Sequence, residues 1–486
     1  MVEQVEPPSS DPSPVPVMTS GSYPARAGNR VRLLIDGLPA FRRICEAIDS
    51  AQRSVWTTIA FMWPAFEMPD SRGTALDALN QAAGRGLDVR IIFWRPDEET
   101  GSLRRNAFWG TAGHLSLLRN RYRHLNVRWD RASAGYCQHQ KSWLIDAGME
   151  GQTSFVGGIN LNPNSMVAPG HAGEGQNHDV YLELSGPSAV DVQHNFVQRW
   201  NEASERDAMD GLCGAQAACP LPFPTTIPKQ GGPSLVQIQR TVPGGRYCDG
   251  TAAPAAACFD IGAGEQTIAA QYIAALRGAR SAIYIENQYV EVPEIVAELD
   301  RALARGVQVV LVMPAVPELV PRAYDALDRR AVFDARAALG RFPNFTLAGL
   351  AGQTRDGRRT PVYVHSKLMI VDDAWATVGS CNLHRFSLYG NCEMNAAIWC
   401  PAAVTQMRIE LFREHLDLDT SGLDCRGALK AFQSVVRANR DRFIAGDPQW
   451  QGLAFGLDVT TYGRQRQFSA LAIATGQEMP SLPTSC

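Results

Sequence analysis

One short pattern of histidine, lysine and aspartate occurs twice in this chain, and its duplication limits the fold more strongly than any other feature of the sequence. The first copy reads HQKSWLID and the second reads HSKLMIVD. The repeated residues are His139, Lys141 and Asp146 in the first copy and His365, Lys367 and Asp372 in the second. Two copies with identical spacing predict a fold built from two related halves.

The repetition continues beyond the two motifs and keeps the same order. FVGGINL follows the first motif and TVGSCNL follows the second, which places Asn160 opposite Asn382. Farther along, Asp179 corresponds to Glu393, and each of these carboxylates lies eight residues before a proline. A duplication of this length predicts that each half contributes an equivalent set of polar side chains to a divided site.

Each half also begins with the same succession of a helix, a strand, a second helix and a second strand. Apolar residues three and four apart indicate the helices, and short runs rich in Val, Ile and Phe indicate the strands. The segments are residues 40–52, 54–63, 75–84 and 87–94 in the first half, and residues 268–280, 281–290, 294–304 and 307–314 in the second. This succession predicts parallel strands joined by right-handed crossovers.

Each histidine motif is predicted to lead into a pair of neighbouring strands. The apolar residues between lysine and aspartate form the first strand, and the turn that contains Asn160 or Asn382 follows the second. Histidine and lysine are two residues apart in both motifs, and residues at that interval in a strand point to the same face of the sheet. We therefore expect the two side chains of each motif to converge on one point.

These patterns divide the 486 residues into five parts. A Pro-rich leader is expected to be disordered over residues 1–28. The first half takes residues 29–204, and the second half takes residues 263–445. Residues 205–262, which are rich in Gly, Pro, Ala and Cys, are predicted to form an irregular linker. Residues 446–486 form a C-terminal extension whose pattern is too mixed to assign.

The bulk composition is that of a soluble globular protein, with 45% hydrophobic and 20% charged residues and no long apolar run. The N-terminus lacks the basic and apolar regions of a secretion signal, so we expect a cytoplasmic, peripherally membrane-associated protein, with signal-independent export left open. The formal net charge of −3 disfavours nucleic acid as a partner. The spacing of the 11 cysteines does not match a zinc site, and we expect them to be free or locally bridged.

The repeated residues have the properties needed to bind and cleave a phosphodiester. Lysine and asparagine side chains donate hydrogen bonds to a phosphoryl group, and a neutral imidazole offers a lone pair. With two copies, one histidine attacks phosphorus in line while the other protonates the departing oxygen, which produces a covalent phosphohistidine. Cationic side chains supply the charge stabilisation, so we expect neither a metal ion nor another cofactor.

The carboxylates of the repeat fall into two classes. Asp179 and Glu393 are the symmetric candidates to orient the imidazoles through the far ring nitrogen. Asp146 and Asp372 belong to the catalytic motifs but follow the lysines by five residues, so they point to the opposite face of the strand. We expect a structural, charge-pairing role for these two. Histidines outside the repeat are interpreted as structural, and they include His171, His178 and His194.

Together these motifs closely resemble the phospholipase D superfamily, whose signature is the duplicated His-Lys-Asp set. The segment from Gly264 to Pro293 is similar to the region before the second motif in phosphatidylcholine-cleaving phospholipases D. The resemblance implies an α/β fold of two α/β/α sandwich halves, each a mixed β-sheet flanked by helices. It also implies that a pseudo-two-fold axis relates the halves and that the active site lies at their junction.

The same resemblance implies that His139 is the nucleophile and that His365 is the general acid and then the general base. The residues implied to bind phosphoryl oxygens are Lys141, Lys367, Asn160 and Asn382. The chain departs from the commoner family pattern in having Ser380 where the first half has Gly158, and Glu393 where it has Asp179. Both departures occur within the family, so activity is still expected.

The leading functional prediction is a phospholipase D that hydrolyses phospholipids to phosphatidic acid and a head-group alcohol, with transphosphatidylation. The expected partners are a phospholipid substrate, a transiently bound membrane surface and a water or alcohol acceptor, with the protein acting as a monomer. An alternative is a cardiolipin synthase-type phosphatidyltransferase, although those enzymes usually carry N-terminal membrane segments. Further alternatives are a metal-independent nuclease, which local arginine clusters would serve, and an inactive phosphate- or membrane-binding module.

Overall fold

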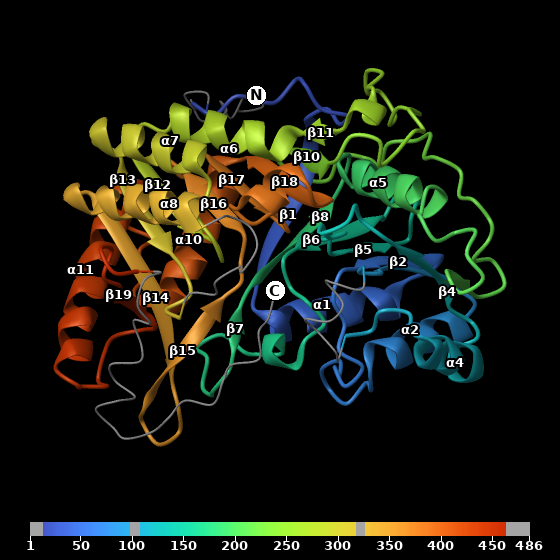
Figure 1. Cartoon of the computed structure of the whole chain (residues 1–486), viewed down its shortest axis with the longest axis horizontal. Coiled ribbons are helices and arrows are strands. Elements are labelled where there is room, and N and C mark those ends of the chain that lie inside the picture. Colours follow the sequence, from blue (N-terminus) through green and yellow to red (C-terminus); the bar gives the residue numbers. More distant parts are fainter. Residues whose placement is uncertain (1–12, 98–106, 317–325, 463–486) are drawn as a thin grey trace, which may run out of the picture.

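The computed structural model describes residues 13–97, 107–316 and 326–462, and it places two mixed β-sheets side by side with helices on their faces (Figure 1). The first half lies on the right of the view and the second half on the left. This is the α/β architecture that the duplicated pattern predicts. Within the described residues, none of the helices has the length and apolar content required to cross a membrane.

The sheet of the first half has two parallel pairs at its centre and antiparallel pairs around them. In spatial order its strands are β9 (Leu212–Cys213), β4 (Asn126–Asp130), β3 (Asp88–Trp94), β2 (Ser54–Ile59), β5 (Ser142–Ile145), β6 (Thr153–Gly157), β8 (Val180–Ser185) and β1 (Arg26–Ile35). Strands β2, β3 and β4 are parallel, as the predicted crossovers require, and the remaining neighbours are antiparallel.

The sheet of the second half repeats this order and these directions. Its strands are β14 (Phe345–Gln353), β13 (Gln308–Val312), β12 (Ala282–Glu286), β16 (Leu368–Val371), β17 (Trp375–Gly379), β18 (Glu393–Trp399) and β10 (Ser234–Val242). The additional strands β15 (Arg359–Val364) and β19 (Ala454–Gly456) pair with β14, and β11 (Glu265–Gln266) pairs with β10. Strand β1 also pairs with β10, which joins the two sheets.

Helices cover both faces of each sheet because alternate strand residues are apolar on both sides. The helices of the first half are α1 (Gly37–Ser50), α2 (Ala75–Gly84), α4 (Ala112–Arg121) and α5 (Ala189–Asn201). Those of the second half are α6 (Thr267–Gly278), α7 (Pro293–Ala304), α8 (Ala326–Ala338), α9 (Arg385–Tyr389), α10 (Pro401–Leu416) and α11 (Cys425–Ile444). In β12, for example, Ile283 packs in the core with Leu299 of α7, whereas Tyr284 packs with Phe412 of α10.

An Arg-Gly pair follows α2 in the first half and α7 in the second. Its glycine ends that helix, and its arginine caps the preceding helix, α1 or α6. Gly86 and Gly306 have φ values of 90° and 86°, a left-handed conformation that glycine adopts without strain. Arg85 donates a hydrogen bond to the Ile48 carbonyl at the end of α1, and Arg305 donates one to the Leu276 carbonyl near the end of α6. The repeated dipeptide therefore sets the same helix packing in each half.

The structure contradicts two parts of the predicted division, the irregular linker and the disordered leader. Strand β10 lies inside the predicted linker, yet it is the first strand of the second half and pairs with β18 as β1 pairs with β8. Residues 13–28 of the predicted disordered leader pack on the fold, with Val15 and Tyr23 each 2% exposed. The C-terminal extension supplies β19 to the second sheet. Residues 1–12 and 463–486 lie outside the described residues.

Candidate active site

The two histidine motifs occupy equivalent places, and each histidine is anchored on the chain of the opposite half. Gln138, just before His139, forms a parallel bridge with Cys392, and the His139 N–H donates to the Cys392 carbonyl at 2.9 Å. In the other half, β15 pairs in parallel with β7 (Asn177–His178), and the His365 N–H donates to the His178 carbonyl at 2.8 Å. These crossed backbone bonds bring the two motifs together at the junction of the halves.

The carboxylates cross between the halves in the same way. Nδ1 of His139 lies 2.9 and 3.0 Å from the two oxygens of Glu393, and Nδ1 of His365 lies 2.6 Å from Oδ2 of Asp179. All four side chains are nearly inaccessible to solvent. Each carboxylate therefore fixes the ring of a histidine that belongs to the other half and directs Nε2 away from itself.

The two motif lysines are buried next to the histidines. Nζ of Lys141 donates to the His139 carbonyl at 2.8 Å, and Nζ of Lys367 donates to the His365 carbonyl. Lys367 also lies 3.4 Å from the side-chain carbonyl of Gln288, which follows strand β12. Sequence reasoning missed Gln288 as a site residue, although it lies in the segment that carried the family resemblance. Each lysine side chain is thus buried against the backbone of the histidine in its own motif.

Burial and the surrounding charges give the two halves of the site different electrostatics. Burial lowers the pKa of His139 to about 4, against the opposing effect of Glu393. Burial also lowers the pKa of Lys367 to about 7 and raises the pKa of Asp179 to about 7, although each charge counteracts the shift of the other. Burial would raise the pKa of Glu393 too, but His139 and Lys141 outweigh it and hold that pKa below its usual value. A pKa this low corresponds to a neutral His139 imidazole at pH 7.

The motif aspartates stabilise turns. The Asp146 carboxylate accepts hydrogen bonds from the backbone N–H groups of residues 52, 53 and 54, and Asp372 accepts them from residues 280, 281 and 282. Both aspartates have a positive φ, 57° and 55°, at the end of their strands. Their partners are backbone amides rather than the charged side chains that we expected, because the start of the neighbouring strand β2 or β12 faces them.

Asn160 and Asn382 lie three residues beyond the ends of β6 and β17, in equivalent turns. Their side chains are 5% and 4% exposed. The residue after each asparagine forms a hydrogen bond to the segment that follows β2 or β12. The Leu161 N–H donates to the Phe61 carbonyl, and the Leu383 N–H donates to the side chain of Asn287. The asparagines therefore occupy symmetric positions, and their contact with a phosphoryl group remains a prediction.

The pairing of Ser380 with Glu393 and of Gly158 with Asp179 has a steric explanation. The Ser380 hydroxyl donates a hydrogen bond of 2.6 Å to Glu393 Oε2 and so supports the longer carboxylate. In the first half a Cβ atom on Gly158 would lie only 2.4 Å from Asp179 Oδ1. Asp179 therefore requires glycine at position 158, whereas Glu393 is supported by the serine at position 380. The two departures from the family pattern, Ser380 and Glu393, thus depend on each other.

Replacing Gly158 by alanine should displace Asp179 from His365 and reduce turnover by about 10²-fold, since small misplacements of reacting groups have effects of this size. Ser380→Ala is the matched control, because it removes the hydroxyl that donates to Glu393 and accepts from the Met394 N–H, and adds no atom. We expect the control to retain much more activity. Steady-state turnover with circular dichroism of both variants checks the prediction, and a fully active, folded Gly158→Ala variant would contradict it.

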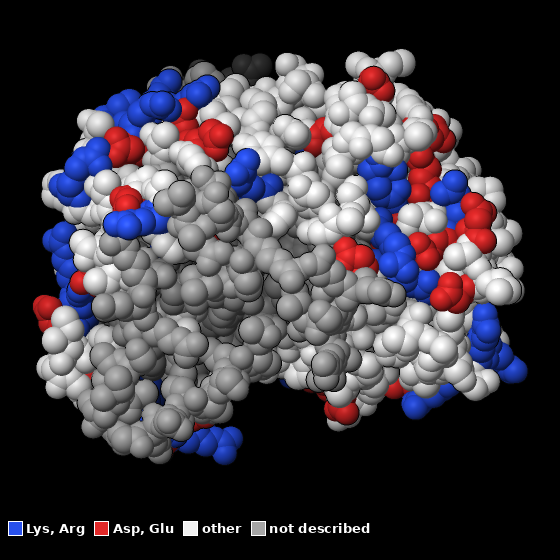
Figure 2. Space-filling view, in the orientation of Figure 1, with Lys and Arg blue, Asp and Glu red and all other residues white. Residues whose placement is uncertain are grey.

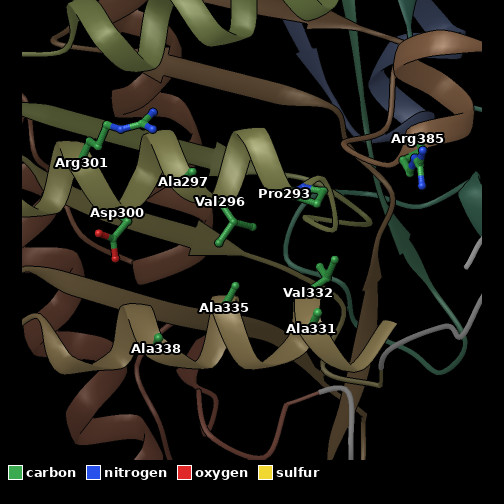
Figure 3. A pocket seen from close by; sticks show the side chains of 10 residues that line it. All are labelled: Pro293, Val296, Ala297, Asp300, Arg301, Ala331, Val332, Ala335, Ala338 and Arg385. Atoms are coloured by element: carbon green, nitrogen blue, oxygen red, sulfur yellow. The ribbon is translucent and has the colours of Figure 1, made fainter. Parts of the chain in front are cut away.

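A pocket with a volume of about 480 Å³ lies between α7 and α8 rather than at the paired histidines (Figure 3). Its lining is mostly alanine, valine and proline, with Asp300, Arg301 and Arg385 as the charged residues. None of the motif residues lines it. On the face of the molecule in Figure 2, the basic and acidic side chains that are described lie interspersed, so neither sign of charge forms a continuous surface there.

Comparison with known proteins finds two related family profiles that match this chain. The profile of the family described as cardiolipin synthase, PLD-like domain, matches residues 44–200 and 272–415, and that of the family described as phospholipase D matches residues 165–291. Similar proteins include cardiolipin synthase A of Pseudomonas putida, 26% identical over 382 residues, which cover 77% of this chain and 66% of the relative. This chain therefore spans about two thirds of that relative.

Two more relatives and one solved structure extend the comparison. The major cardiolipin synthase ClsA of Bacillus subtilis is 24% identical over 80% of this chain and 69% of its own length. Phospholipase D alpha 2 of Oryza sativa is 25% identical over 78% of this chain and 60% of its own length. The crystal structure of a phosphatidylserine synthase from Haemophilus influenzae superposes with a TM-score of 0.51 at 12% identity, covering 87% of this chain and 96% of that chain, which shows a shared fold.

Proposed function

This chain belongs to the phospholipase D superfamily, and from that membership we propose that it is a phosphatidyltransferase of the cardiolipin synthase type. One phosphatidylglycerol supplies the phosphatidyl group, and the hydroxyl of a second phosphatidylglycerol accepts it. The names of the similar bacterial proteins favour this alternative over the hydrolytic phospholipase D that we expected first. The observation that carries the proposal is the pair of buried imidazoles, each held by a carboxylate of the opposite half.

In the first step, the lone pair on Nε2 of neutral His139 attacks phosphorus and forms a P–N bond. The P–O bond to glycerol breaks, and His365 gives its Nε2 proton to the departing oxygen. Glu393 stabilises the positive charge that forms on the His139 ring, because its carboxylate lies within 3.0 Å of Nδ1. The products of this step are glycerol and a phosphatidyl-histidine enzyme.

In the second step, His365 acts as a base because it is now neutral. It removes the proton from the acceptor hydroxyl, whose oxygen attacks phosphorus while the P–N bond to His139 breaks. An alcohol acceptor gives a transfer product, and water gives phosphatidic acid, so both outcomes pass through one intermediate. Lys141 and Lys367 supply the positive charge that stabilises the phosphoryl oxygens in both steps.

The proposal is tested with purified protein and vesicles of phosphatidylglycerol, with products separated by mass spectrometry. We expect cardiolipin and an equal amount of free glycerol. Parallel vesicles of phosphatidylcholine with ethanol test the second candidate, phospholipase D, because that activity produces phosphatidylethanol and choline. If phosphatidylglycerol gave only phosphatidic acid while phosphatidylcholine was cleaved efficiently, the second candidate would replace the first.

The ratio kcat/KM should fall as pH rises above about 7, by about tenfold per pH unit, because Lys367 binds the phosphodiester only when protonated. Burial sets its pKa at about 7 in the free enzyme. A bound phosphodiester raises that pKa, so kcat should persist to higher pH than kcat/KM. In Lys367→Arg the guanidinium stays protonated, so any residual activity should not show the part of this decline that Lys367 causes. A kcat/KM that stays constant to pH 9 in the unmodified enzyme would refute the assignment.

The nuclease alternative depends on two arginine clusters, in residues 119–131 and 329–341, and each cluster contains a buried arginine. Arg128 and Arg336 are 2% and 1% exposed. Arg128 donates to the carbonyls of Ala217 and Trp200, and Arg336 donates to the carbonyl of Tyr462. These two guanidinium groups therefore have internal partners and do not form part of a surface for phosphates.

A further inference from the structure

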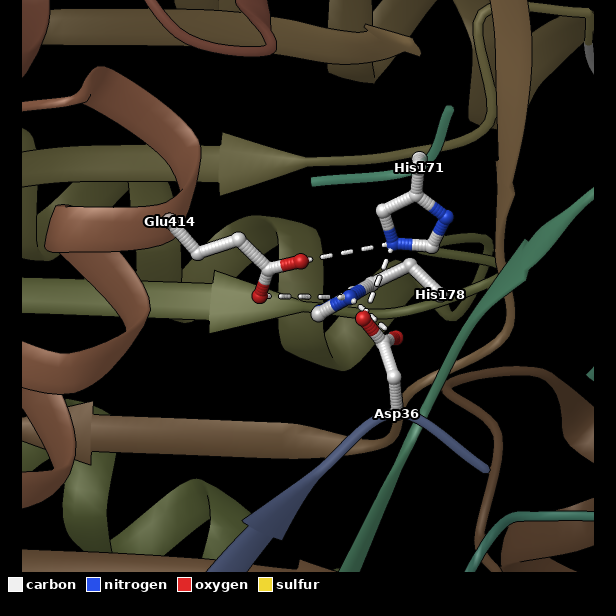
Figure 4. Close-up of side chains that lie close together, drawn as sticks. All are labelled: Asp36, His171, His178 and Glu414. Carbon is white, nitrogen blue, oxygen red and sulfur yellow. Dashed lines mark hydrogen bonds and ion pairs between the residues drawn. The ribbon is translucent and has the colours of Figure 1, made fainter. Parts of the chain in front are cut away.

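Four side chains that sequence reasoning left without a functional role converge behind the candidate active site. They are Asp36 at the end of β1, His171 in the loop before β7, His178 in β7 and Glu414 in α10 (Figure 4). Asp36, His171 and His178 have no exposed surface, and the Glu414 side chain is 5% exposed. Three of the four residues belong to the first half and one belongs to the second.

The polar atoms of the four residues lie close enough to share one metal ion, because one ligand atom from each lies within 4.8 Å of the others. Nε2 of His171 lies 3.1 Å from Asp36 Oδ2 and 3.4 Å from Glu414 Oε1. Nδ1 of His178 lies 3.0 Å from Asp36 Oδ1 and 4.0 Å from Glu414 Oε2. Tetrahedral zinc with nitrogen and oxygen ligands at its usual bond lengths places those atoms about 3.3 Å apart.

Several of these atoms are buried without a hydrogen bond. Asp36 Oδ2, Glu414 Oε2 and both ring nitrogens of His171 lack a hydrogen-bond partner. Buried polar atoms are normally paired, and each exception needs an explanation. His171 Nε2 and Asp36 Oδ2 lie 3.1 Å apart without the angle of a hydrogen bond, whereas His178 Nδ1 and Asp36 Oδ1, 3.0 Å apart, form one.

The backbone and the surrounding residues are also arranged as in a metal site. Asp36 has φ 64° and ψ 161°, a region that is almost exclusive to glycine and that other residues occupy mainly at functional sites. The second ring nitrogen of His178 lies 3.0 Å from Glu286 Oε2. Glu286 in turn accepts hydrogen bonds of 2.6 Å from Tyr284 and Ser366. A histidine ligand commonly has such a carboxylate on its other nitrogen, which fixes its tautomer and orientation.

From this geometry we propose that Asp36, His171, His178 and Glu414 bind one structural Zn²⁺ ion that joins the two halves. Two imidazoles and two carboxylates suit zinc better than calcium or magnesium, which prefer oxygen ligands alone. With all four positions taken by protein, the ion has no open position for substrate. Its place in the chain links it to the active site, because His178 precedes Asp179 and Ser366 follows His365. The expectation that catalysis itself needs no metal is unaffected.

The test measures metal in the full-length protein without substrate, so it is independent of the proposed transfer activity. Protein purified without added metal and without chelator should contain about one zinc per chain by inductively coupled plasma mass spectrometry. The variants His171→Gln and Glu414→Gln should each bind zinc at least 100-fold more weakly in a competition titration with a chromophoric chelator. His194→Gln is the matched control, since its buried ring contacts Tyr23 and Thr251 instead of the cluster, and it should bind zinc normally.

A second measurement keeps the test informative if a variant folds poorly. Removal of zinc from the unmodified protein with a chelator should lower its Tm by several degrees, and added Zn²⁺, but not Ca²⁺ or Mg²⁺, should restore the Tm. Protein that contains no stoichiometric zinc and shows no zinc-dependent Tm would overturn the proposal and leave the cluster as a buried ion-pair network. Restoration by Ca²⁺ or Mg²⁺ would overturn the choice of zinc.

Discussion

His139→Ala is expected to lower the rate of phosphatidyl transfer by at least about 10⁴-fold, because the variant has no atom that can form the covalent bond to phosphorus. The loss should be the same for a natural head group and for an activated one such as p-nitrophenol, since the nucleophile is needed in both cases. After acid quenching, radiolabelled substrate should leave a phosphoryl adduct on the unmodified protein and none on His139→Ala.

His365→Ala should differ from His139→Ala in a way that separates the two roles. Nitrophenolate leaves without a proton, so His365→Ala should release a burst of about one nitrophenol per chain and then stop, because no base activates the acceptor. The phosphoryl adduct should accumulate on His139 and be located by peptide mass spectrometry. An adduct on His365 of the unmodified protein would show that the two histidines have the opposite roles.

The second large effect is expected from the crossed carboxylates. Glu393→Gln should reduce activity by about 10² to 10⁴-fold, since the amide cannot stabilise the positive charge that develops on His139. Because Glu393 contacts His139, this variant should lose activity equally with natural and activated head groups. Asp179→Asn removes the partner of His365. That variant should therefore behave like His365→Ala. It should form the phosphoryl-enzyme at a normal rate when the leaving group is nitrophenolate, because that group needs no proton.

This pair of variants tests the crossing itself. If each carboxylate served the histidine of its own half, the results would be exchanged. Asp179→Asn would lose activity equally with both head groups, as His139→Ala does, and Glu393→Gln would release a burst of nitrophenol, as His365→Ala does. Glu183→Gln is a suitable control, because Glu183 lies in β8 near Asp179 but pairs with Arg43. The control should retain nearly full transfer activity, and stopped-flow measurement of nitrophenol release distinguishes the patterns.

Local patterns were sufficient to predict most of the fold. The strands and helices of the two crossovers have strong periodicity, and the strands of each crossover pair in parallel as predicted. Strand β10 was missed although SLVQIQRTV alternates, because glycine, proline and cysteine on both sides made the region look irregular. Its pairing with β18 stabilises it, and a partner about 150 residues away is not visible in a local window.

In the candidate site, too, the sequence predicted local features but not the contacts between distant segments. His139 and Lys141 were predicted to share a face of a strand because of their spacing. Strand β5 begins only at Ser142, after both residues, and what joins the two is a hydrogen bond from Lys141 Nζ to the His139 carbonyl. Asp146 was expected to pair with a charged side chain, but its partners are backbone amides of residues 52–54, and their approach depends on the docking of β2 against β5. His171 and His178 were interpreted as ordinary, because sequence gave no reason to associate them with Glu414, more than 200 residues away.

The sequence by itself determined the duplication, the chemical groups of the site and the two-half architecture, because repeats and strand periodicity depend only on local intervals. The tertiary structure alone decided which carboxylate serves which histidine and which residues meet behind the site. His139 and Glu393 are 254 positions apart, and His365 and Asp179 are 186 positions apart. Contacts over such intervals depend on how two folded halves pack against each other, and only their docking brings those side chains together.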